Sequence, residues 1–191
     1  MTDPRIDEWL AISGALRHGH FRLSSGLHSP AYVQCALLLE HPERAARLGR
    51  MLADRLRDRQ PDSVLSPALG GLIIGYEVAR SLERPFRFVE RQEGTMCLRR
   101  GFHLTPGERL VIVEDVVTTG RSTNEAVAVA AAAGAEVCAI ASILDRSGDS
   151  EPFSVPFVSL KQLALPVWSA ADCPLCARGE PIDRPGSRPD S

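Results

Sequence analysis

The chain has 191 residues, 44% of them hydrophobic and 24% charged, and this composition excludes a collagen, a coiled coil or a disordered chain as a description of the whole. Its 22 basic and 24 acidic residues give a net charge of −2, which argues against a dedicated binder of nucleic acid or of anionic membranes. We expect one domain at 1–180 and a mobile tail at 181–191, where three prolines and little apolar content indicate disorder.

A cytoplasmic location is expected, because neither a membrane span nor a signal peptide is recognisable. No stretch approaches the roughly 20 consecutive apolar residues of a span, and residues 1–9 mix acids and bases without an apolar core. The five cysteines are odd in number and widely spread, unlike the disulfide framework of a small secreted domain. We therefore expect reduced thiols.

The apolar pattern predicts alternating helices and strands along most of the chain. A helix is expected at 7–18, and a turn followed by a strand at 21–35. The later predicted elements are a helix at 42–59, a strand at 64–65, a helix at 71–82, strands at 86–90 and 110–113, a helix at 123–133 and a strand at 137–144. This alternation favours an α/β domain with a central, mostly parallel sheet flanked by helices.

Two stretches show no clean periodicity. Residues 91–108 contain three glycines and one proline, and their length is typical of a functional loop, so we expect a loop that closes at about 92–101. Past Ser147 the chain is expected to be loop-like.

The segment 109–123, RLVIVEDVVTTGRST, carries the strongest chemical signal in the sequence. An apolar strand delivers Glu114 and Asp115 at its carboxyl end, the edge at which open parallel sheets bind ligands. The loop that follows leads into a helix whose free N–H groups suit a phosphate, and Gly120 lets the backbone approach that phosphate. Because the carboxylates accept hydrogen bonds from a sugar diol, the segment offers sites for both a phosphate and a ribose.

A simpler interpretation is that Ser122 caps this helix and forms a capping box with Glu125. The box does not account for two carboxylates followed by Thr-Thr-Gly, and both interpretations can hold together. A Walker A loop is excluded because its Gly-Lys-Ser/Thr ending is missing, and a Rossmann fingerprint because its glycine spacing is missing. A second, weaker anion site is predicted at Gly70 and Gly71, between a strand and a helix.

The segment 109–123 resembles the phosphoribosyl-pyrophosphate signature of the type I phosphoribosyltransferases. Residues 21–32, FRLSSGLHSPAY, resemble the amino-terminal element of the orotate phosphoribosyltransferases, and 89–91, 98–102 and 144–146 resemble later elements in the same order. The resemblance covers about residues 6–186. It implies the type I phosphoribosyltransferase fold, with a small amino-terminal hood at about 1–38 and a mobile active-site loop.

The resemblance also implies the substrate-binding residues. Those for phosphoribosyl pyrophosphate (PRPP) would be Arg91, Glu114, Asp115, Val116, Val117, Thr118, Thr119, Gly120, Arg121 and Ser122. Arg91 would hold the pyrophosphate, while Glu114 and Asp115 are also predicted as catalytic residues. Orotate would be held by Thr118 and Arg146, because a guanidinium fork matches a carboxylate; the alternative for Arg146 is a solvated arginine at a strand end.

Lysines that many members of this family carry are missing here. Ser24 and Gly70 stand at two of those positions, and lysine occurs only once in the chain. In the expected loop, Arg99 and Arg100 are the nearest source of positive charge and are predicted as catalytic residues. Arginines stabilise a pyrophosphate without protonating it. The alternative is that both are surface charges at the base of the loop.

The implied reaction transfers ribose 5-phosphate from PRPP to orotate, giving orotidine 5′-monophosphate and pyrophosphate in pyrimidine synthesis. Mg²⁺ is implied as the cofactor, held mainly through substrate oxygens and water, and a homodimer with shared sites as the assembly. Two alternatives are a transferase for a purine or another neutral base, against which Arg146 argues, and a PRPP sensor that regulates transcription. The sensor would need a DNA-binding module, and none is recognisable.

The histidines show no metal-ligand spacing, and each is expected at the surface. They are His18, His20, His28, His41 and His103, of which His103, beside the expected loop, is a candidate acid or base. Cys173 and Cys176 have the spacing of half a zinc site, but no second pair follows, and a structural zinc needs four ligands. We therefore expect no zinc site.

Overall fold

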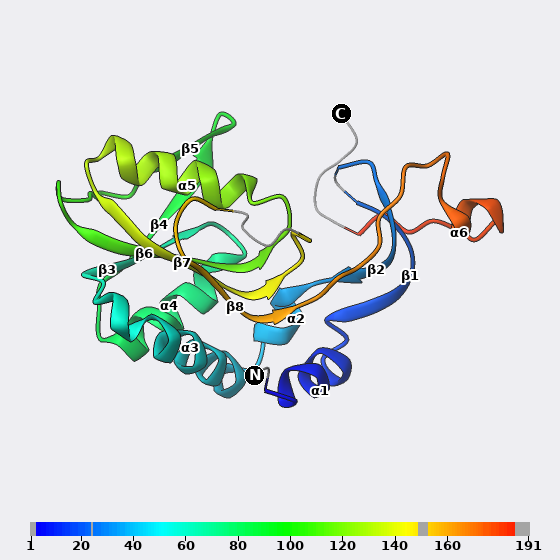
Figure 1. Cartoon of the computed structure of the whole chain (residues 1–191), viewed down its shortest axis with the longest axis horizontal. Helices are drawn as coiled ribbons and strands as arrows, with labels where there is room; N and C mark the ends of the chain where they lie inside the picture. Colours follow the sequence, from blue (N-terminus) through cyan, green and yellow to red (C-terminus); the bar gives the residue numbers. More distant parts are fainter. Residues whose placement is uncertain (1–2, 24, 149–152, 186–191) are drawn as a thin grey trace. The chain divides into compact units, whose positions relative to one another are not determined.

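The structure is a computed structural model of the chain, and it describes residues 3–23, 25–148 and 153–185 (Figure 1). The chain divides into two compact units, the first being Leu39–Leu163 and the second Pro4–Leu38 with the chain from Ala164. In the described part of the chain, no helix combines the length and the apolar content needed to cross a membrane. Ser24, which stands at one of the lysine positions of the family that the sequence resembles, lies outside the described residues.

Among the described residues of the first unit, six strands form one sheet in the order β5-β4-β3-β6-β7-β8. The strands are β3 (Ser63–Pro67), β4 (Phe86–Gln92), β5 (Thr95–Leu98), β6 (Arg109–Val117), β7 (Glu136–Asp145) and β8 (Phe157–Gln162). Neighbouring strands are parallel except for β4 and β5, which are antiparallel. The predicted central, mostly parallel sheet is confirmed.

Helices cover both faces of this sheet, as predicted. Helices α3 (Pro42–Leu56) and α4 (Gly71–Leu82) pack on one face, and α5 (Arg121–Ala132) packs on the other (Figure 1). The helix predicted at 71–82 is α4, and the one predicted at 42–59 is α3 followed by a turn of 3₁₀ helix, η1 (Arg57–Arg59). The three helices therefore hold the sheet between two layers.

The core explains why β6 lies in the middle of the sheet. Five consecutive residues of β6 are buried, as a parallel strand covered on both faces requires. Ile112 of β6 packs with Ile140 of β7 and with Ala126 and Ala130 of α5. The small alanines let α5 approach the sheet closely, and the start of α5 is thereby fixed next to the end of β6.

The second unit contains α1 (Arg5–Ile12) and an antiparallel pair, β1 (Leu16–Arg22) and β2 (His28–Val33). The helix predicted at 7–18 is therefore wrong beyond Ile12, because the chain turns at Gly14, with a φ of +65°, and enters β1. The strand predicted within 21–35 is β2, and the short helix α2 (Cys35–Leu39) follows it.

Besides β1, two further strands escaped prediction because they lie in stretches without clean periodicity. The four residues of β5 fall within the expected loop at 91–108, where Glu93 and Gly94 form a two-residue turn with positive φ values of 53° and 83°. That segment is therefore partly a β-hairpin. Strand β8 and the four-residue helix α6 (Pro174–Ala177) lie in the stretch past Ser147 that was expected to be loop-like.

Two further expectations change in the second unit. His20 and His28 were each expected at the surface, but both are buried, with 5% of their surface exposed. Of the tail expected at 181–191, residues 186–191 lie outside the described residues. Within 181–185, the N–H of Asp183 donates to the carbonyl of His20 at 2.8 Å, so this part of the tail is paired with β1.

Gly49→Ala tests the close crossing of α3 and α4. A Cβ at Gly49 would lie 2.5 Å from the Cβ and 2.8 Å from the carbonyl carbon of Glu77 on α4. At an open helix position alanine is about 1 kcal/mol better than glycine, whereas overpacking costs about 1–3 kcal/mol. Urea unfolding should therefore show a loss of stability. Arg50→Ala, on the exposed side of α3, is the control and should stay within about 0.5 kcal/mol of wild type; a stable Gly49→Ala protein would contradict the close crossing.

Candidate active site

The predicted site residues of the first unit, except Arg99 and Arg100 after the antiparallel strand β5, lie along one edge of the sheet. They lie at or just beyond the carboxyl ends of β3, β4, β6 and β7, which run parallel. The chain passes from β3 to β4 on one side and later from β6 to β7 on the other, so the strand order reverses between β3 and β6. In open α/β sheets, such a switch point is where ligands bind.

Glu114 and Asp115 lie at this switch point, near the carboxyl end of β6. Burial raises the pKa of Glu114 well above its usual range, and the negative charge of Asp115 adds to the rise. Burial also raises the pKa of Asp115, although the N–H of Val116, which donates to its Oδ1 at 2.8 Å, works in the opposite direction. Two crowded carboxylates favour a ligand that brings hydrogen-bond donors or positive charge.

Two glycines after β3 make room for this pair. A Cβ on Gly70 would lie 2.6 Å from Oδ1 of Asp115, and a Cβ on Gly71 would lie 3.2 Å from Oε1 of Glu114. Only residues without a side chain fit between the carboxylates and the amino end of α4, which begins at Gly71. The positive end of the α4 dipole therefore lies beside the two carboxylates.

The loop from β6 to α5 places a second helix start at the same edge. Gly120, with a φ of +69°, is the N-cap of α5, and no side chain among the described residues caps the helix. The capping box predicted for Ser122 and Glu125 is therefore wrong. The N–H of Arg121 donates to Oγ1 of Thr119 at 3.4 Å, while the other N–H groups of the first turn are positioned for an anion.

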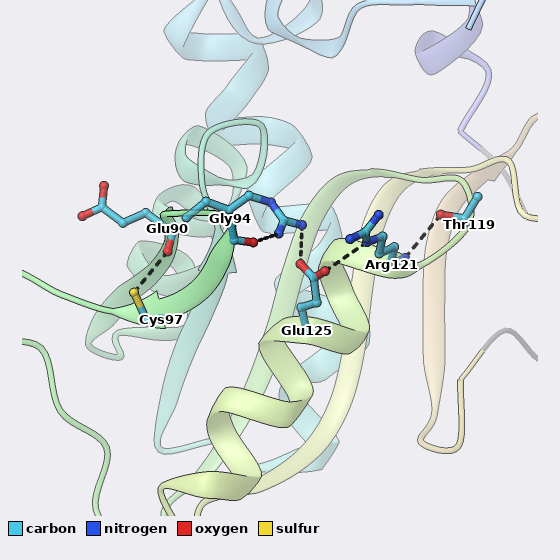
Figure 2. A network of polar contacts seen from close by, with 7 residues as sticks. Glu90, Gly94, Cys97, Thr119, Arg121 and Glu125 are labelled. Atoms are coloured by element: carbon cyan, nitrogen blue, oxygen red, sulfur yellow. Dashed lines mark hydrogen bonds and ion pairs between the residues drawn. The ribbon is translucent and has the colours of Figure 1, made fainter. Parts of the chain in front are cut away.

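Glu125 has a different role from the predicted one (Figure 2). It accepts a hydrogen bond from Nε of Arg121 at 3.0 Å and forms an ion pair with Arg91 of β4. Arg91 also donates to the carbonyl of Gly94 at 2.8 Å. Two arginines predicted to bind PRPP thus meet on one carboxylate at the start of α5. The spacing of Arg121 and Glu125, four residues apart on a helix, was the signal that could have revealed this pair.

The two loop arginines share another carboxylate, that of Glu90 on β4. Arg100 donates to both carboxylate oxygens of Glu90, at 2.9 and 3.1 Å. Nη1 of Arg99 lies 3.6 Å from Oε1 of the same residue. The hydrogen bond from Arg100 lowers the pKa of Glu90. Both arginines are more than two-fifths exposed and occupy the position expected for charges at the base of the loop.

His103 is exposed as predicted.

The structure brings Thr118 and Arg146 to neighbouring strand ends. Val117 of β6 is in register with Asp145 of β7, and the N–H of Arg146 donates to the carbonyl of Val117 at 2.8 Å. Thr118 and Arg146 are the next residues along the two strands. Two residues that lie far apart in the sequence therefore share one corner of the edge, next to the carboxylate pair on β6.

The comparisons with known proteins agree with this arrangement. Residues 36–175 match the family model described as phosphoribosyl transferase domain. The chain is 51% identical over 183 residues to the orotate phosphoribosyltransferase of Thermotoga petrophila, covering 96% of this chain and 98% of the relative.

The chain belongs to the orotate phosphoribosyltransferases.

The orotate phosphoribosyltransferase of Heliobacterium modesticaldum is 49% identical over 190 residues, which cover 98% of this chain and 100% of the relative. The crystal structure of the Aeropyrum pernix enzyme superposes with a TM-score of 0.68 at 26% identity, covering 83% of this chain and 93% of that one. The type I phosphoribosyltransferase fold expected from the sequence is confirmed.

Replacing both carboxylates, Glu114→Gln with Asp115→Asn, should stabilise the free protein while weakening PRPP binding and turnover. Because both pKa values are raised on folding, the folded wild type loses stability as the pH rises from about 4, the unfolded pKa, through the folded values. The amides do not titrate. The melting temperature of the variant should therefore be a few degrees above that of wild type near pH 7. Below about pH 4 the difference should be smaller.

Melting curves across this pH range and calorimetric titration with PRPP measure the two effects. An unfolded double variant would give the carboxylates a structural role. A folded variant that binds PRPP as tightly as wild type would contradict their assignment to the ribose.

Proposed function

We propose that the chain is a cytoplasmic enzyme that transfers ribose 5-phosphate from PRPP to orotate, forming orotidine 5′-monophosphate and pyrophosphate for UMP synthesis. The proposal rests on the observation that three groups of candidate site residues lie along one edge of the sheet. The carboxylate pair of β6, the uncapped start of α5 and Arg146 after β7 lie side by side, in a chain half identical to orotate phosphoribosyltransferases along nearly its whole length.

The ribose 5-phosphate half of PRPP fits the segment from β6 to α5. The N–H groups of the first turn of α5 and the hydroxyl groups of Thr118, Thr119 and Ser122 bind the 5-phosphate. Glu114 and Asp115 accept hydrogen bonds from the ribose hydroxyl groups. As pyrophosphate leaves and positive charge develops at C1 of the ribose, the same two carboxylates stabilise that charge.

The pyrophosphate half fits Arg91 and the start of α4. Arg91 exchanges the carboxylate of Glu125 for a phosphate group, because a guanidinium fork matches either partner. The oxygen-rich edge around Glu114 and Asp115 offers the hard donors that suit Mg²⁺. Mg²⁺ bound near these residues, mainly through substrate oxygens and water, would supply positive charge that neutralises the leaving group.

The orotate half fits Thr118 and Arg146. The guanidinium of Arg146 binds the orotate carboxylate as a bidentate pair, and Thr118 adds a hydroxyl group beside it. The ring nitrogen of orotate then attacks C1 as the pyrophosphate departs. A purine offers no carboxylate to Arg146, which disfavours the alternative of a purine transferase.

Orotate consumption by the purified protein with PRPP and Mg²⁺ tests the proposal. Loss of the orotate absorbance should follow addition of PRPP, with pyrophosphate released in equal amount, and adenine should give no product. Turnover of adenine in preference to orotate would contradict the substrate. PRPP binding without any turnover would favour the alternative of a PRPP sensor.

Arg146→Ala should raise the KM for orotate far more than the KM for PRPP. Removal of a charge-assisted pair with a carboxylate costs on the order of 1.5–3 kcal/mol, which corresponds to a loss of about 10- to 150-fold in kcat/KM for orotate. Uracil lacks the carboxylate and serves as the matched substrate, whose slow turnover should barely change. Equal losses with orotate and uracil would contradict the carboxylate contact.

In this proposal, Arg99 and Arg100 assist the departure of pyrophosphate. The enzyme acts as a homodimer whose two active sites are shared between the subunits. Arg99 and Arg100 are the only arginines at 92–101. In the free protein they lie on Glu90. When the loop closes, at least one of them leaves Glu90 and reaches the pyrophosphate of the neighbouring subunit, where its charge stabilises the leaving group.

Mixing two inactive variants tests this assignment. Subunits with Arg99→Ala/Arg100→Ala, combined with subunits carrying Glu114→Gln/Asp115→Asn, should form hybrid dimers in which one site has both intact parts. Part of the wild-type rate should return. Hybrids that form and remain as inactive as their parents would contradict shared sites, and a fully active Arg99→Ala/Arg100→Ala homodimer would remove both arginines from the mechanism.

A further inference from the structure

Four metal-binding side chains of the second unit converge although the sequence separates them widely. They are His20, His28, Cys173 and Cys176, and one candidate ligand atom of each lies within 4.8 Å of the other three. His20, His28 and Cys173 are buried, and Cys176 is exposed. None of the four belongs to the proposed substrate site.

The separations match a tetrahedral zinc site. With Zn–N distances of about 2.0–2.1 Å and Zn–S distances of about 2.3 Å, tetrahedral ligand atoms lie about 3.3 Å apart for two nitrogens and about 3.6 Å apart for nitrogen and sulfur. Nε2 of His20 lies 3.0 Å from Nδ1 of His28, and 3.6 and 3.7 Å from Sγ of Cys173 and Cys176. Nδ1 of His28 lies 3.3 Å from Sγ of Cys176. For these four pairs of atoms, an ion at the centre needs shifts of only a few tenths of an ångström, and the remaining pairs lie within 4.8 Å.

The strands aim both histidines at this point. The register of β1 against β2 shifts between His18 and Phe21, and His20 and Phe21 are both buried, which breaks the alternation of a regular strand. Such a bulge re-aims a side chain. On β2, the register pairs His28 with Arg22. The two imidazoles thus face each other from neighbouring strands.

The carboxyl-terminal segment brings the cysteines to the same point. Trp168 exchanges two backbone hydrogen bonds with His28, at 2.8 and 2.9 Å. Asp183 donates to the carbonyl of His20 and accepts from the N–H of Arg22. Between these two anchors, Cys173 precedes the short helix α6 and Cys176 lies within it. The backbone itself holds both thiols against β1 and β2.

The hydrogen bond on the far side of His20 sets its ring for metal binding. Nδ1 of His20 lies 2.9 Å from the carbonyl oxygen of Glu180. A carbonyl only accepts, so Nδ1 carries the proton and the lone pair of Nε2 points toward His28 and the two cysteines. Metal-bound histidines commonly donate their other N–H to a carbonyl in this way.

We propose that His20, His28, Cys173 and Cys176 bind one Zn²⁺ as a structural site. Because the protein fills all four positions of the tetrahedron, no position is left for a substrate. The two thiolates balance the charge of the ion. The site joins residues that are 148 positions apart, His28 and Cys176, and stabilises a unit whose own sheet has only two strands. This proposal does not depend on the proposed function.

The alternative to zinc binding is that Cys173 and Cys176 form a disulfide with each other. It would leave His20 and His28 buried with their nitrogens directed at sulfurs that no longer ligate, whereas zinc gives all four groups a partner. A hollow of about 510 Å³, lined in part by His20, His28 and Cys176, opens beside the cluster. Metal ions and chelators therefore have a path to it.

Metal analysis of the full chain, purified without added metal or chelator, is the first test. We expect about one zinc per wild-type chain after gel filtration, and background zinc in Cys173→Ser/Cys176→Ser. Cys97→Ser, a cysteine of the first unit outside the cluster, is the matched control and should keep its zinc. Absence of zinc from wild type, equal zinc in the double variant, or an intact mass two hydrogens lighter because of a disulfide would each overturn the proposal.

Cobalt substitution in wild type provides a second test that does not depend on how well a variant folds. Chelator treatment should lower the melting temperature by several degrees, and one equivalent of zinc should restore it. One equivalent of Co²⁺ should give the strong visible bands of a tetrahedral site together with thiolate charge-transfer bands in the near ultraviolet. Weak, octahedral-type bands without thiolate absorption, or a melting temperature indifferent to chelator and zinc, would overturn the proposal.

Discussion

The constraint on which the first unit depends is the placement of two consecutive carboxylates, Glu114 and Asp115, at the end of a buried strand. Burial raises the pKa of both, and the negative charge of Asp115 raises that of Glu114 further. The neighbouring structure accommodates the pair instead of neutralising it: Gly70 and Gly71 leave space for the oxygens, and the start of α4 presents its positive end. The free protein thus holds a destabilised pair of carboxylates, and the proposed binding of a polyhydroxyl ligand would relieve it.

A second feature of the candidate site is that four of its five predicted arginines already lie against carboxylates. Arg91 and Arg121 share Glu125, while Arg99 and Arg100 share Glu90. The guanidinium fork binds carboxylate and phosphate with the same geometry, so in the proposed mode of binding a phosphorylated ligand would replace an existing carboxylate partner.

Local sequence signals predicted the elements that carry the proposed PRPP-binding residues. The apolar run of β6 and the long helices α3, α4 and α5 have strong periodicity, and their positions follow from it. Strand β5 has four residues and no distinct pattern, and α1 was extended too far because Leu16 continued its helical spacing by chance. The role of Glu125 was missed because the residue also fits a capping box, and only the position of Arg91 decides between the two.

The cluster of His20, His28, Cys173 and Cys176 could not be found by spacing rules. Such rules detect ligands that are close in sequence, and here only the two cysteines satisfy them. The histidines owe their orientation to a bulge in β1 and to backbone pairing with a segment near the carboxyl end of the chain. Tertiary pairing over such distances leaves no periodic trace in the sequence.

The central claim is that the switch point between β3 and β6 binds the substrate. Its most direct test is backbone amide hydrogen exchange, measured by mass spectrometry with and without PRPP and Mg²⁺. Exchange should slow in peptides covering 115–123, at the start of α5, and 68–72, at the start of α4, while β8 at 157–162 serves as the internal reference and stays unchanged. Saturating PRPP that leaves 115–123 and 68–72 unprotected, or that protects only segments away from this edge, would contradict the account.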